Sequence, residues 1–464
     1  MVHLSSVDIF LILLYAATTL FIGFRSSRSS GSSTTEYLLA GRSLTLPVFV
    51  ATLVSTWYGG ILGVGEFSYR FGISNWIVFG IPYYIFAFVF AVFFAKKIRD
   101  TNFTTIPDQL EHAYGKPTAV AGAVLTFLLV NPAAYALMLG LLVQLLFGWG
   151  LSLSVITATV VSVLILVLGG FRSDVSTNVF QFVLMFLGFA LMLSFAEAHF
   201  GGADFLRTNL PPLHLSATGG NSAQFIIAWF FIALWTLVDP AFHQRCYAAK
   251  DAATAQRGIF VSILFWAIFD FFTTTTGLYA RAAIPTLSNP AFSYPMLAEL
   301  ILPPVAKGIF YIALLATIMS TLSSLTLIGG ITVGKDIVGR IIRLQEEDVK
   351  GWSNGGIALT TLAAIALALV VPSVVGLWYT VGTCVVPGLL LPVISTYVPR
   401  LRIPSPFVLA SMAMTFLCST TCLIIGQMAA SHGAAEYPFG IEPMYPGLAV
   451  SVGIWVTGLF MGRK

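Results

Sequence analysis

The sequence predicts an all-α polytopic membrane protein, and its composition and hydropathy lead to this fold class. Of the 464 residues, 57% are hydrophobic and only 9% are charged, whereas about a quarter of the residues of a soluble domain are charged. The mean hydropathy is +0.90. The apolar residues also come in runs of about 20, the length that crosses a bilayer as a helix. A net charge of +4 without a basic cluster excludes a nucleic-acid binder.

Thirteen apolar runs predict 13 transmembrane helices in a single membrane domain, residues 1–464. The first run is expected to be a retained leading helix, because it lacks the basic residue that precedes the apolar part of a signal peptide. The expected helices lie near residues 7–24, 46–68, 75–95, 118–146, 151–170, 174–196, 224–248, 258–280, 305–333, 354–371, 374–398, 405–428 and 446–462.

The basic residues predict the orientation of these helices. With the N-terminus outside, every Lys and Arg falls on the cytoplasmic side except Arg70, Arg207, Arg281 and Lys307. Cytoplasmic loops of membrane proteins carry an excess of Lys and Arg. We therefore expect a multi-pass protein of the plasma (inner) membrane, with its N-terminus outside and its C-terminus cytoplasmic.

Two of the expected helices are interrupted. The second contains Gly59-Gly60, and the seventh contains Asp239-Pro240. Glycine leaves helical geometry at little cost, and proline disfavours the α conformation of the residue before it. These helices open two successive sets of five, 46–196 and 224–398, and matched interruptions indicate a binding site at the membrane midplane. The alternative is close packing at the glycines and a simple kink at the proline.

The ninth expected helix carries a stripe of hydroxyl groups. Thr317, Ser320, Thr321 and Ser324 recur at i, i+3, i+4 and i+7, so their oxygens share one face of an otherwise apolar helix. A hard cation such as Na⁺ prefers oxygen ligands of this kind. The alternative is that these side chains bond to carbonyls of their own helix or hold neighbouring helices together.

The same segments resemble the sodium/solute symporter family. The ninth helix, Ala316 to Ser324, is similar to the signature helix of that family. Four more segments resemble family motifs in the same order, namely Leu62 to Ile73, Thr105 to Lys116, Gly169 to Gln181 and Asp239 to Gly258. The resemblance covers roughly residues 7–400 and implies a leucine-transporter-like fold, with two inverted five-helix repeats, one helix before them and two after them at 405–462. It also implies alternating access driven by Na⁺.

The resemblance further implies where Na⁺ binds as the coupling ion. In the family, carbonyls of the broken first core helix and oxygens of the signature helix form the principal sodium site. On this sequence the corresponding groups are the carbonyls of Leu53, Thr56 and Thr317 and the side-chain oxygens of Ser320 and Thr321. The hydroxyl stripe selects the same helix face independently of the resemblance.

A second sodium site occurs in some members of the family. Its serines correspond to Ser323 and Ser324, but its aspartate position is occupied by Asn178. The missing carboxylate removes charge that offsets the desolvation of a cation. Asp174, one helical turn earlier, is either a substitute ligand or a solvated loop residue. We therefore expect one Na⁺ per transport cycle.

The substrate contacts that the resemblance implies are Trp57, Gly60, Tyr83 and Asp239. Trp57 and Tyr83 are similar to residues of the choline-transporter branch, where aromatic rings hold a quaternary amine, but Asp239 stands where that branch has another aromatic residue. Asp239 could balance a cationic substrate, bond sugar hydroxyls, hold a gate with Arg245 or a backbone amide, or cap the broken helix. Sugars, amino acids, carboxylates and organic cations all remain open as the solute.

The function that the sequence favours is sodium-coupled import of a small polar organic solute across the lipid bilayer. Proton coupling through Asp239 or Asp174 is the main alternative. A transporter-like sensor is less expected, because only Arg463 and Lys464 follow the last helix. We expect no enzymatic activity, because the sequence lacks nucleophile, phosphate-loop and metal motifs. The oligomeric state stays open.

Overall fold

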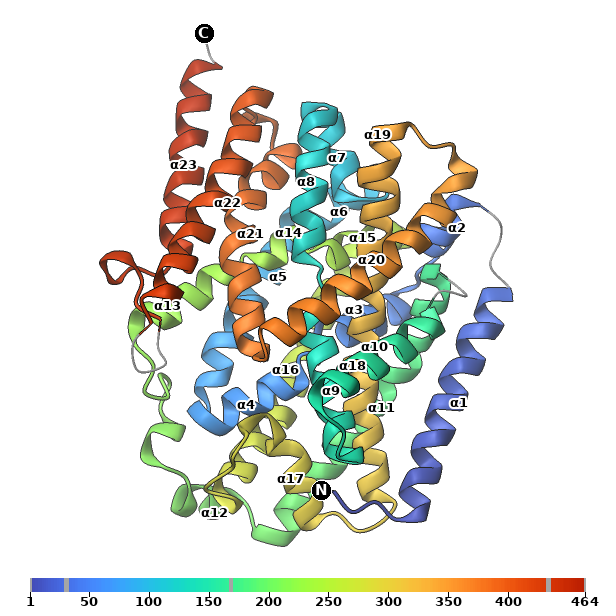
Figure 1. The fold of residues 1–464 in the computed structure, drawn as a ribbon, viewed down its shortest axis with the longest axis vertical. Coiled ribbons are helices and arrows are strands. Elements are labelled where there is room, and N and C mark those ends of the chain that lie inside the picture. The colour runs from blue at the N-terminus through green and yellow to red at the C-terminus, as the bar shows by residue number, and fades with distance from the viewer. Residues whose placement is uncertain (1, 29–32, 167–169, 431–434, 463–464) are drawn as a thin grey trace.

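The computed structural model describes residues 2–28, 33–166, 170–430 and 435–462, so Gly169, Arg463 and Lys464 lie outside it. Its regular structure is helical, and the described residues form only one isolated β-bridge, between Leu44 and Ala249. The bundle is elongated, and α1 begins at the end opposite to the one where α23 finishes (Figure 1). The all-α fold class predicted from the sequence is confirmed.

The apolar runs form helices, and some runs are divided into two or three shorter helices. These are α1 (Ser6–Arg28), α3 (Leu46–Trp57), α4 (Ile61–Phe71), α5 (Ile81–Phe93), α8 (Lys116–Leu129), α9 (Ala133–Phe147), α10 (Leu151–Leu166), α11 (Gly170–Phe200), α13 (Ala223–Ile232), α14 (Trp235–Val238), α15 (Pro240–Ala248), α16 (Ala252–Ala283), α18 (Ala306–Ile331), α20 (Val349–Val370), α21 (Val374–Tyr397), α22 (Ser405–Met428) and α23 (Met444–Met461).

Short helices connect these elements. They are α2 (Thr34–Leu39), α6 (Ala95–Asp100), α7 (Ile106–Tyr114), α12 (Ala203–Asn209), α17 (Ser293–Ile301) and α19 (Arg340–Ile342), with π-helical turns at Trp76–Gly80 and Thr332–Gly339. Single 3₁₀ turns lie at Ala40–Arg42, Pro212–Leu215, Pro290–Phe292, Glu346–Asp348, Pro399–Leu401 and Pro438–Gly440. The connections bearing α6, α7 and α19 lie in the upper half of Figure 1, on the side that the basic residues assign to the cytoplasm.

The number of membrane spans is close to the prediction. Among the described residues, 11 helices are long and apolar enough to cross a membrane, and the bent pair α3 and α4 raises the number to 12. The remaining predicted span, 151–170, corresponds to α10, which the structure describes as Leu151–Leu166, and residues 167–169 of this span lie outside the described residues. The count of 13 therefore stays a prediction.

The break between α3 and α4 depends on two glycines. The helices are bent by 59° across Tyr58-Gly59-Gly60. A Cβ atom on Gly59 would lie 2.0 Å from Thr321 Oγ1, and one on Gly60 would lie 2.3 Å from the Trp378 ring. Glycine is required at both positions because the backbone of the break lies directly against α18 and α21.

The seventh predicted span is broken for a different reason. Proline occupies the first position of α15, where the missing N–H costs no helical hydrogen bond. Asp239 precedes it in an extended conformation and caps the helix, because its Oδ1 accepts hydrogen bonds from the N–H groups of Ala241 at 2.6 Å and Phe242 at 3.3 Å. The capping role considered for Asp239 is therefore present.

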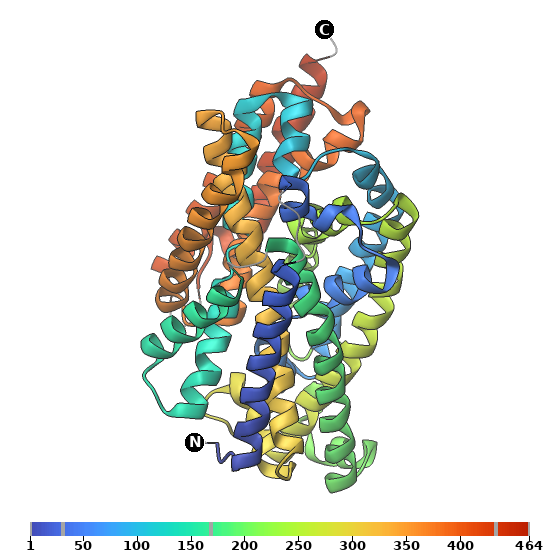
Figure 2. The ribbon, with the colours of Figure 1, turned by 90° about the vertical axis from the view of Figure 1, so that its right-hand side faces the viewer.

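The centre of the bundle is formed by α11, α18 and α3, which pack against one another. Figure 2 shows the outer helix α1 running alongside this group, and α1 contacts both α11 and α18. On the other side, α21, α22 and α23 pack together. Both broken helices thus face the middle of the bundle, where the site lies.

Candidate functional site

Oxygen atoms of α18 and of the end of α3 meet in the core of the bundle. The Ser320 hydroxyl donates to the carbonyl of Ser55 at 2.8 Å and to that of Thr317 at 2.9 Å. The Thr321 hydroxyl donates to the carbonyl of Thr56 at 2.6 Å and reaches that of Ser55 at 3.3 Å. Ser320 and Thr321 are buried. The hydroxyl stripe of α18 therefore faces the broken helix.

The last carbonyls of α3 are available because the helix ends at Trp57. The last four carbonyls of a helix lack an N–H partner within it, and Ser55 and Thr56 belong to this group. The hydroxyls of α18 contact Ser55 rather than the predicted Leu53, which lines the adjacent cavity. The Gly59-Gly60 break in the sequence was the available signal, because a helix that ends just before it leaves the carbonyl of Ser55 without an N–H partner. Neutral hydroxyl and carbonyl oxygens are suitable ligands for Na⁺.

A buried arginine lies beside this oxygen cluster. The side chain of Arg245, from α15, is 0% exposed. Its Nη2 atom lies 2.8 Å from Thr56 Oγ1, 3.0 Å from Ser324 Oγ and 3.3 Å from Asp174 Oδ2. The guanidinium also stacks over the ring of Phe171 at 5.2 Å. The guanidinium of Arg245 therefore contacts the side chain of Thr56, whose carbonyl belongs to the oxygen cluster.

The residues considered for a second sodium site gather around this guanidinium. The Asn178 amide donates to Ser324 Oγ at 3.0 Å and to Asp174 Oδ2 at 3.2 Å, and Ser324 donates to Asp174 at 2.7 Å. Ser323 turns away and bonds to the carbonyl of Met319 on its own helix. Asp174 is fully buried and ion-paired, so it is not a solvated loop residue. Among the described residues, its ion pair is with Arg245.

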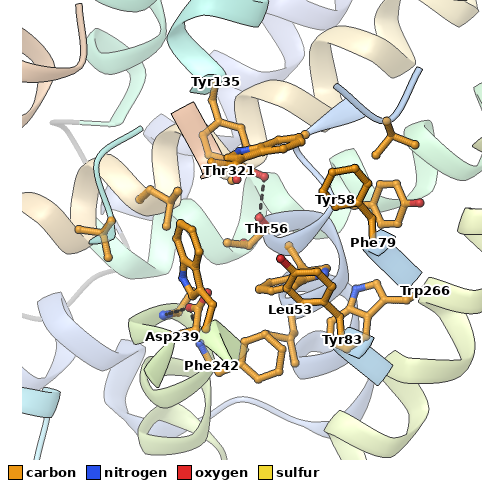
Figure 3. A pocket seen from close by; sticks show the side chains of 18 of the residues that line it. Leu53, Thr56, Tyr58, Phe79, Tyr83, Tyr135, Asp239, Phe242, Trp266 and Thr321 are labelled. Carbon is orange, nitrogen blue, oxygen red and sulfur yellow. Dashed lines mark hydrogen bonds between the residues drawn. The ribbon is translucent and has the colours of Figure 1, made fainter. Parts of the chain in front are cut away.

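A cavity of about 120 Å³ adjoins the oxygen cluster. Figure 3 shows Thr56 and Thr321 in the middle of the view, with Asp239 below them and Tyr58 to one side. The predicted substrate contacts Trp57, Gly60, Tyr83 and Asp239 all line it. Eleven of its lining residues are aromatic, namely Trp57, Tyr58, Phe79, Tyr83, Tyr84, Tyr135, Trp229, Trp235, Phe242, Trp266 and Trp378.

The ring of Trp57 is the centre of an aromatic wall. Its centroid lies 5.2 Å from that of Tyr83, 5.3 Å from that of Phe242 and 5.9 Å from that of Trp266. The contacts with Tyr83 and Phe242 are edge-to-face, which is a favourable arrangement for aromatic pairs. This wall joins the end of α3 to α5, α15 and α16, so its shape depends on where the broken helices stand.

Asp270 is a second carboxylate of the cavity, and the sequence reasoning missed it. It is buried on α16 and lines the cavity, and the phenols of Tyr58 and Tyr84 donate hydrogen bonds to its two oxygens. Tyr58 stands in the break between α3 and α4. The signal was present in the sequence, because an ionisable residue inside an apolar span is a functional candidate by default.

Comparisons with known proteins agree with this geometry. The sequence model of the "Sodium:solute symporter family" matches residues 37–401. The Sodium/pantothenate symporter of Escherichia coli (strain K12) is 26% identical over 76% of both chains. High-affinity choline transporter 1 of Caenorhabditis elegans is 25% identical over 76% of this chain and 67% of its own. A solved structure of a Na⁺-coupled sialic acid symporter, in a substrate-bound outward-open state, superposes with a TM-score of 0.81 at 14% identity, covering 99% of this chain and 98% of its own. This last likeness confirms the predicted fold.

Proposed function

Because the chain belongs to the sodium:solute symporter family, whose members are transporters rather than enzymes, we propose that it imports a small polar organic solute together with Na⁺ by alternating access. The protein is a multi-pass membrane protein by its helices and its family. We place its N-terminus outside and its C-terminus in the cytoplasm. The inverted five-helix repeats are assigned to 46–196 and 224–398, each of which opens with a broken helix.

The sodium ion is assigned to the junction of α3 and α18. Its ligands are the carbonyls of Leu53, Thr56 and Thr317 and the hydroxyls of Ser320 and Thr321, with the Ser55 carbonyl as a further candidate. The observation that carries this proposal is the direct contact of the two hydroxyls with the freed carbonyls of the broken helix. In the ion-bound state the hydroxyl oxygens turn their lone pairs to Na⁺, while their protons need other acceptors.

Coupling follows from the residues that the two sites share. Leu53, Thr56 and Thr321 belong to the proposed ion site and also line the cavity. An ion that holds α3 against α18 fixes the position of Trp57 and hence of the aromatic wall. Sodium binding therefore stabilises the cavity shape that accepts the solute, which is the differential affinity that coupling requires.

One sodium ion per cycle is the stoichiometry that we propose. The oxygens of Asp174, Asn178 and Ser324 surround the guanidinium of Arg245, so the fixed cation stands where a second Na⁺ would be bound. A second ion at this place would meet the repulsion of a buried like charge at short range. Arg245 thus takes the place of the second ion.

Proton coupling is the second candidate. It is favoured by one observation, since Asp239 and Asp270 form no ion pair among the described residues. Asp174, by contrast, is paired with Arg245. Proton coupling predicts uptake that depends on a pH gradient in Na⁺-free buffer, and sodium coupling predicts no uptake under that condition.

The proposal is tested by the thermal stability of the purified protein in Na⁺ and in K⁺ at equal ionic strength. At ten times the dissociation constant, Na⁺ stabilises the folded protein by roughly 1.4 kcal/mol. The double variant Ser320→Ala/Thr321→Ala should lose this Na⁺-specific gain. Thr326→Ala is the matched control, because that buried hydroxyl on the same helix donates to the Leu322 carbonyl within α18, and it should keep the gain. An unchanged Na⁺ response in the double variant contradicts the site.

A further inference from the structure

The charges around the cavity are all of one sign. Its described lining contains the carboxylates of Asp239 and Asp270 and no Lys, Arg or His. The guanidinium of Arg245, which lies 2.8 Å from Thr56 of the lining, is engaged by Asp174, and the ring of His243 contacts the backbone carbonyl of Asp239 from behind the lining. An anionic solute would therefore enter a buried site that offers it no cation and two carboxylates, which is unfavourable in a low-dielectric interior.

The count of charges gives a more specific expectation. Arg245 and Asp174 balance each other, and the proposed sodium ligands are all neutral oxygens. Two carboxylates then remain in the lining of the cavity. The sodium ion supplies one positive charge, and a solute with a single positive charge supplies the other. The loaded site is electrically neutral, which is the condition under which buried charges are tolerated.

The surroundings of these carboxylates indicate the kind of cation. Both oxygens of Asp270 accept hydrogen bonds from tyrosines, and Asp239 Oδ1 accepts two from the backbone. Donors of the chain thus use part of the acceptor capacity of both carboxylates, and most of the remaining lining is aromatic or aliphatic and offers an N–H-rich ammonium few acceptors. A methylated ammonium has few or no N–H groups. It is attracted by charge and by the faces of aromatic rings, and eleven aromatic residues line the cavity.

Two indole N–H groups add a further requirement. Trp229 and Trp266 line the cavity and are at most 2% exposed, and within the described chain their Nε1 atoms have no acceptor. A buried N–H without an acceptor is costly, and native structures usually satisfy it. An oxygen atom of the solute, such as a hydroxyl or carbonyl oxygen, would accept from one of these groups.

From these observations, and resting on the proposed function, we propose that the solute is a monovalent organic cation with a methylated ammonium group and an oxygen atom. Its ammonium group is held between the aromatic wall around Trp57 and the carboxylates of Asp239 and Asp270. Asp270 is a binding residue that acts together with Tyr58 and Tyr84, which orient its carboxylate.

The test compares two probes of nearly the same shape. Choline carries the methylated ammonium, whereas 3,3-dimethyl-1-butanol has a carbon atom in place of the nitrogen and no charge. The thermal stability of the purified full-length protein is measured in saturating Na⁺ with each probe. Choline should raise the unfolding temperature in a concentration-dependent way, and the alcohol should not. Tetramethylammonium, glucose, proline and pantothenate are measured in parallel.

Variants then identify the groups that recognise the charge. Asp270→Asn and Asp239→Asn should each weaken choline binding by at least roughly tenfold, because each removes one partner of a buried charge interaction. Asparagine is also a good helix N-cap, so Asp239→Asn keeps the start of α15. The control is Asp204→Asn, since that carboxylate is 99% exposed and distant from the cavity lining, and its choline response should equal that of the wild type.

The outcomes separate this inference from the proposed function. A Na⁺-specific stabilisation without any effect of choline or tetramethylammonium overturns the inference and leaves the sodium site standing. Equal effects of choline and its uncharged analogue, or stabilisation by pantothenate or glucose alone, also overturn it. Absence of the Na⁺ effect itself contradicts the proposed function. Choline stabilisation that persists unchanged in both aspartate variants contradicts the assignment of the two carboxylates.

Discussion

Two buried acidic regions lie near the end of α3, and they differ in whether a basic side chain neutralises them. Asp174 has a cation from the chain itself, because Arg245 reaches it from α15 with both side chains 0% exposed. Asp239 and Asp270, on the cavity side, are hydrogen-bonded but have no ion pair among the described residues. A charge that the chain neutralises serves the structure, whereas charges left without a counter-ion inside a membrane are available to an ion or a solute.

The largest expected effect on stability comes from breaking the buried ion pair of Arg245 and Asp174. Arg245→Met leaves the Asp174 carboxylate buried without a cation, which costs roughly 3–5 kcal/mol. We expect a large fall in the unfolding temperature or a loss of folded protein on expression, both readily measured by size-exclusion chromatography with fluorescence detection. In the double variant Arg245→Met/Asp174→Asn no unpaired charge remains, and part of the stability should return. A double variant no more stable than Arg245→Met would show that the pair is not what stabilises this region.

A methyl group at the break between α3 and α4 is the next largest perturbation. The Cβ atom of Gly59→Ala would lie 2.0 Å from Thr321 Oγ1, so α3 and α18 must separate, at a cost of roughly 1–3 kcal/mol. Because the separation displaces proposed sodium ligands, the Na⁺-specific stabilisation should be lost as well. Gly355→Ala is the control, since a Cβ atom there meets nothing within 4 Å. Retention of the full Na⁺ effect in Gly59→Ala is the contrary result.

A third charged cluster lies at the end assigned to the cytoplasm. Because it is partly exposed to water, its ion pairs should stabilise the fold less than the buried pair of Arg245 and Asp174 does. Asp108 of α7 is 2.6 Å from both Lys335 and Arg340, and the side chains of Asp108 and Lys335 are about a fifth exposed. Asp108→Asn should cost roughly 1–2 kcal/mol, between the values of exposed and of fully buried pairs. This is less than the cost of Arg245→Met.

The pH dependence of this cluster has a defined sign. Burial by itself raises the pKa of Asp108, but the charges of Lys335 and Arg340 outweigh it and hold the pKa well below its usual range. A lowered pKa contributes stability that is present above the unfolded value of about 3.9 and is lost as the pH falls below it. The difference between wild type and Asp108→Asn should therefore be the same at pH 8 and pH 5. A difference that disappears between these values contradicts the ion pairs.

The smallest effect on stability is expected for Asp270, which lines the cavity and has no ion pair among the described residues. Asp270→Asn removes a charge without leaving a charged partner unpaired, and the amide oxygen can still accept from one of Tyr58 and Tyr84 while the amide NH₂ donates to the hydroxyl oxygen of the other. We expect the unfolding free energy without solute to change by less than about 1 kcal/mol in either direction. A loss as large as that of Arg245→Met would mean that Asp270 serves the fold in the way that Asp174 does.

The parts of the site that depend on local patterns were predictable from the sequence. The helix break at Gly59-Gly60 and the hydroxyls of Ser320 and Thr321 follow from residue type and helical period, and the structure brings them together. The role of Arg245 was not predictable, because its partner Asp174 is 71 residues away and only packing decides which carboxylate it reaches.

The central claim is that one Na⁺ binds between α3 and α18, and binding of radioactive ²²Na⁺ to the purified protein tests it most directly. We expect saturation at one ion per chain, no binding in Ser320→Ala/Thr321→Ala, and unchanged binding in Thr326→Ala. Saturation at two ions per chain, or a single ion that still binds the double variant with the affinity of the wild type, would rule out a single sodium site between α3 and α18.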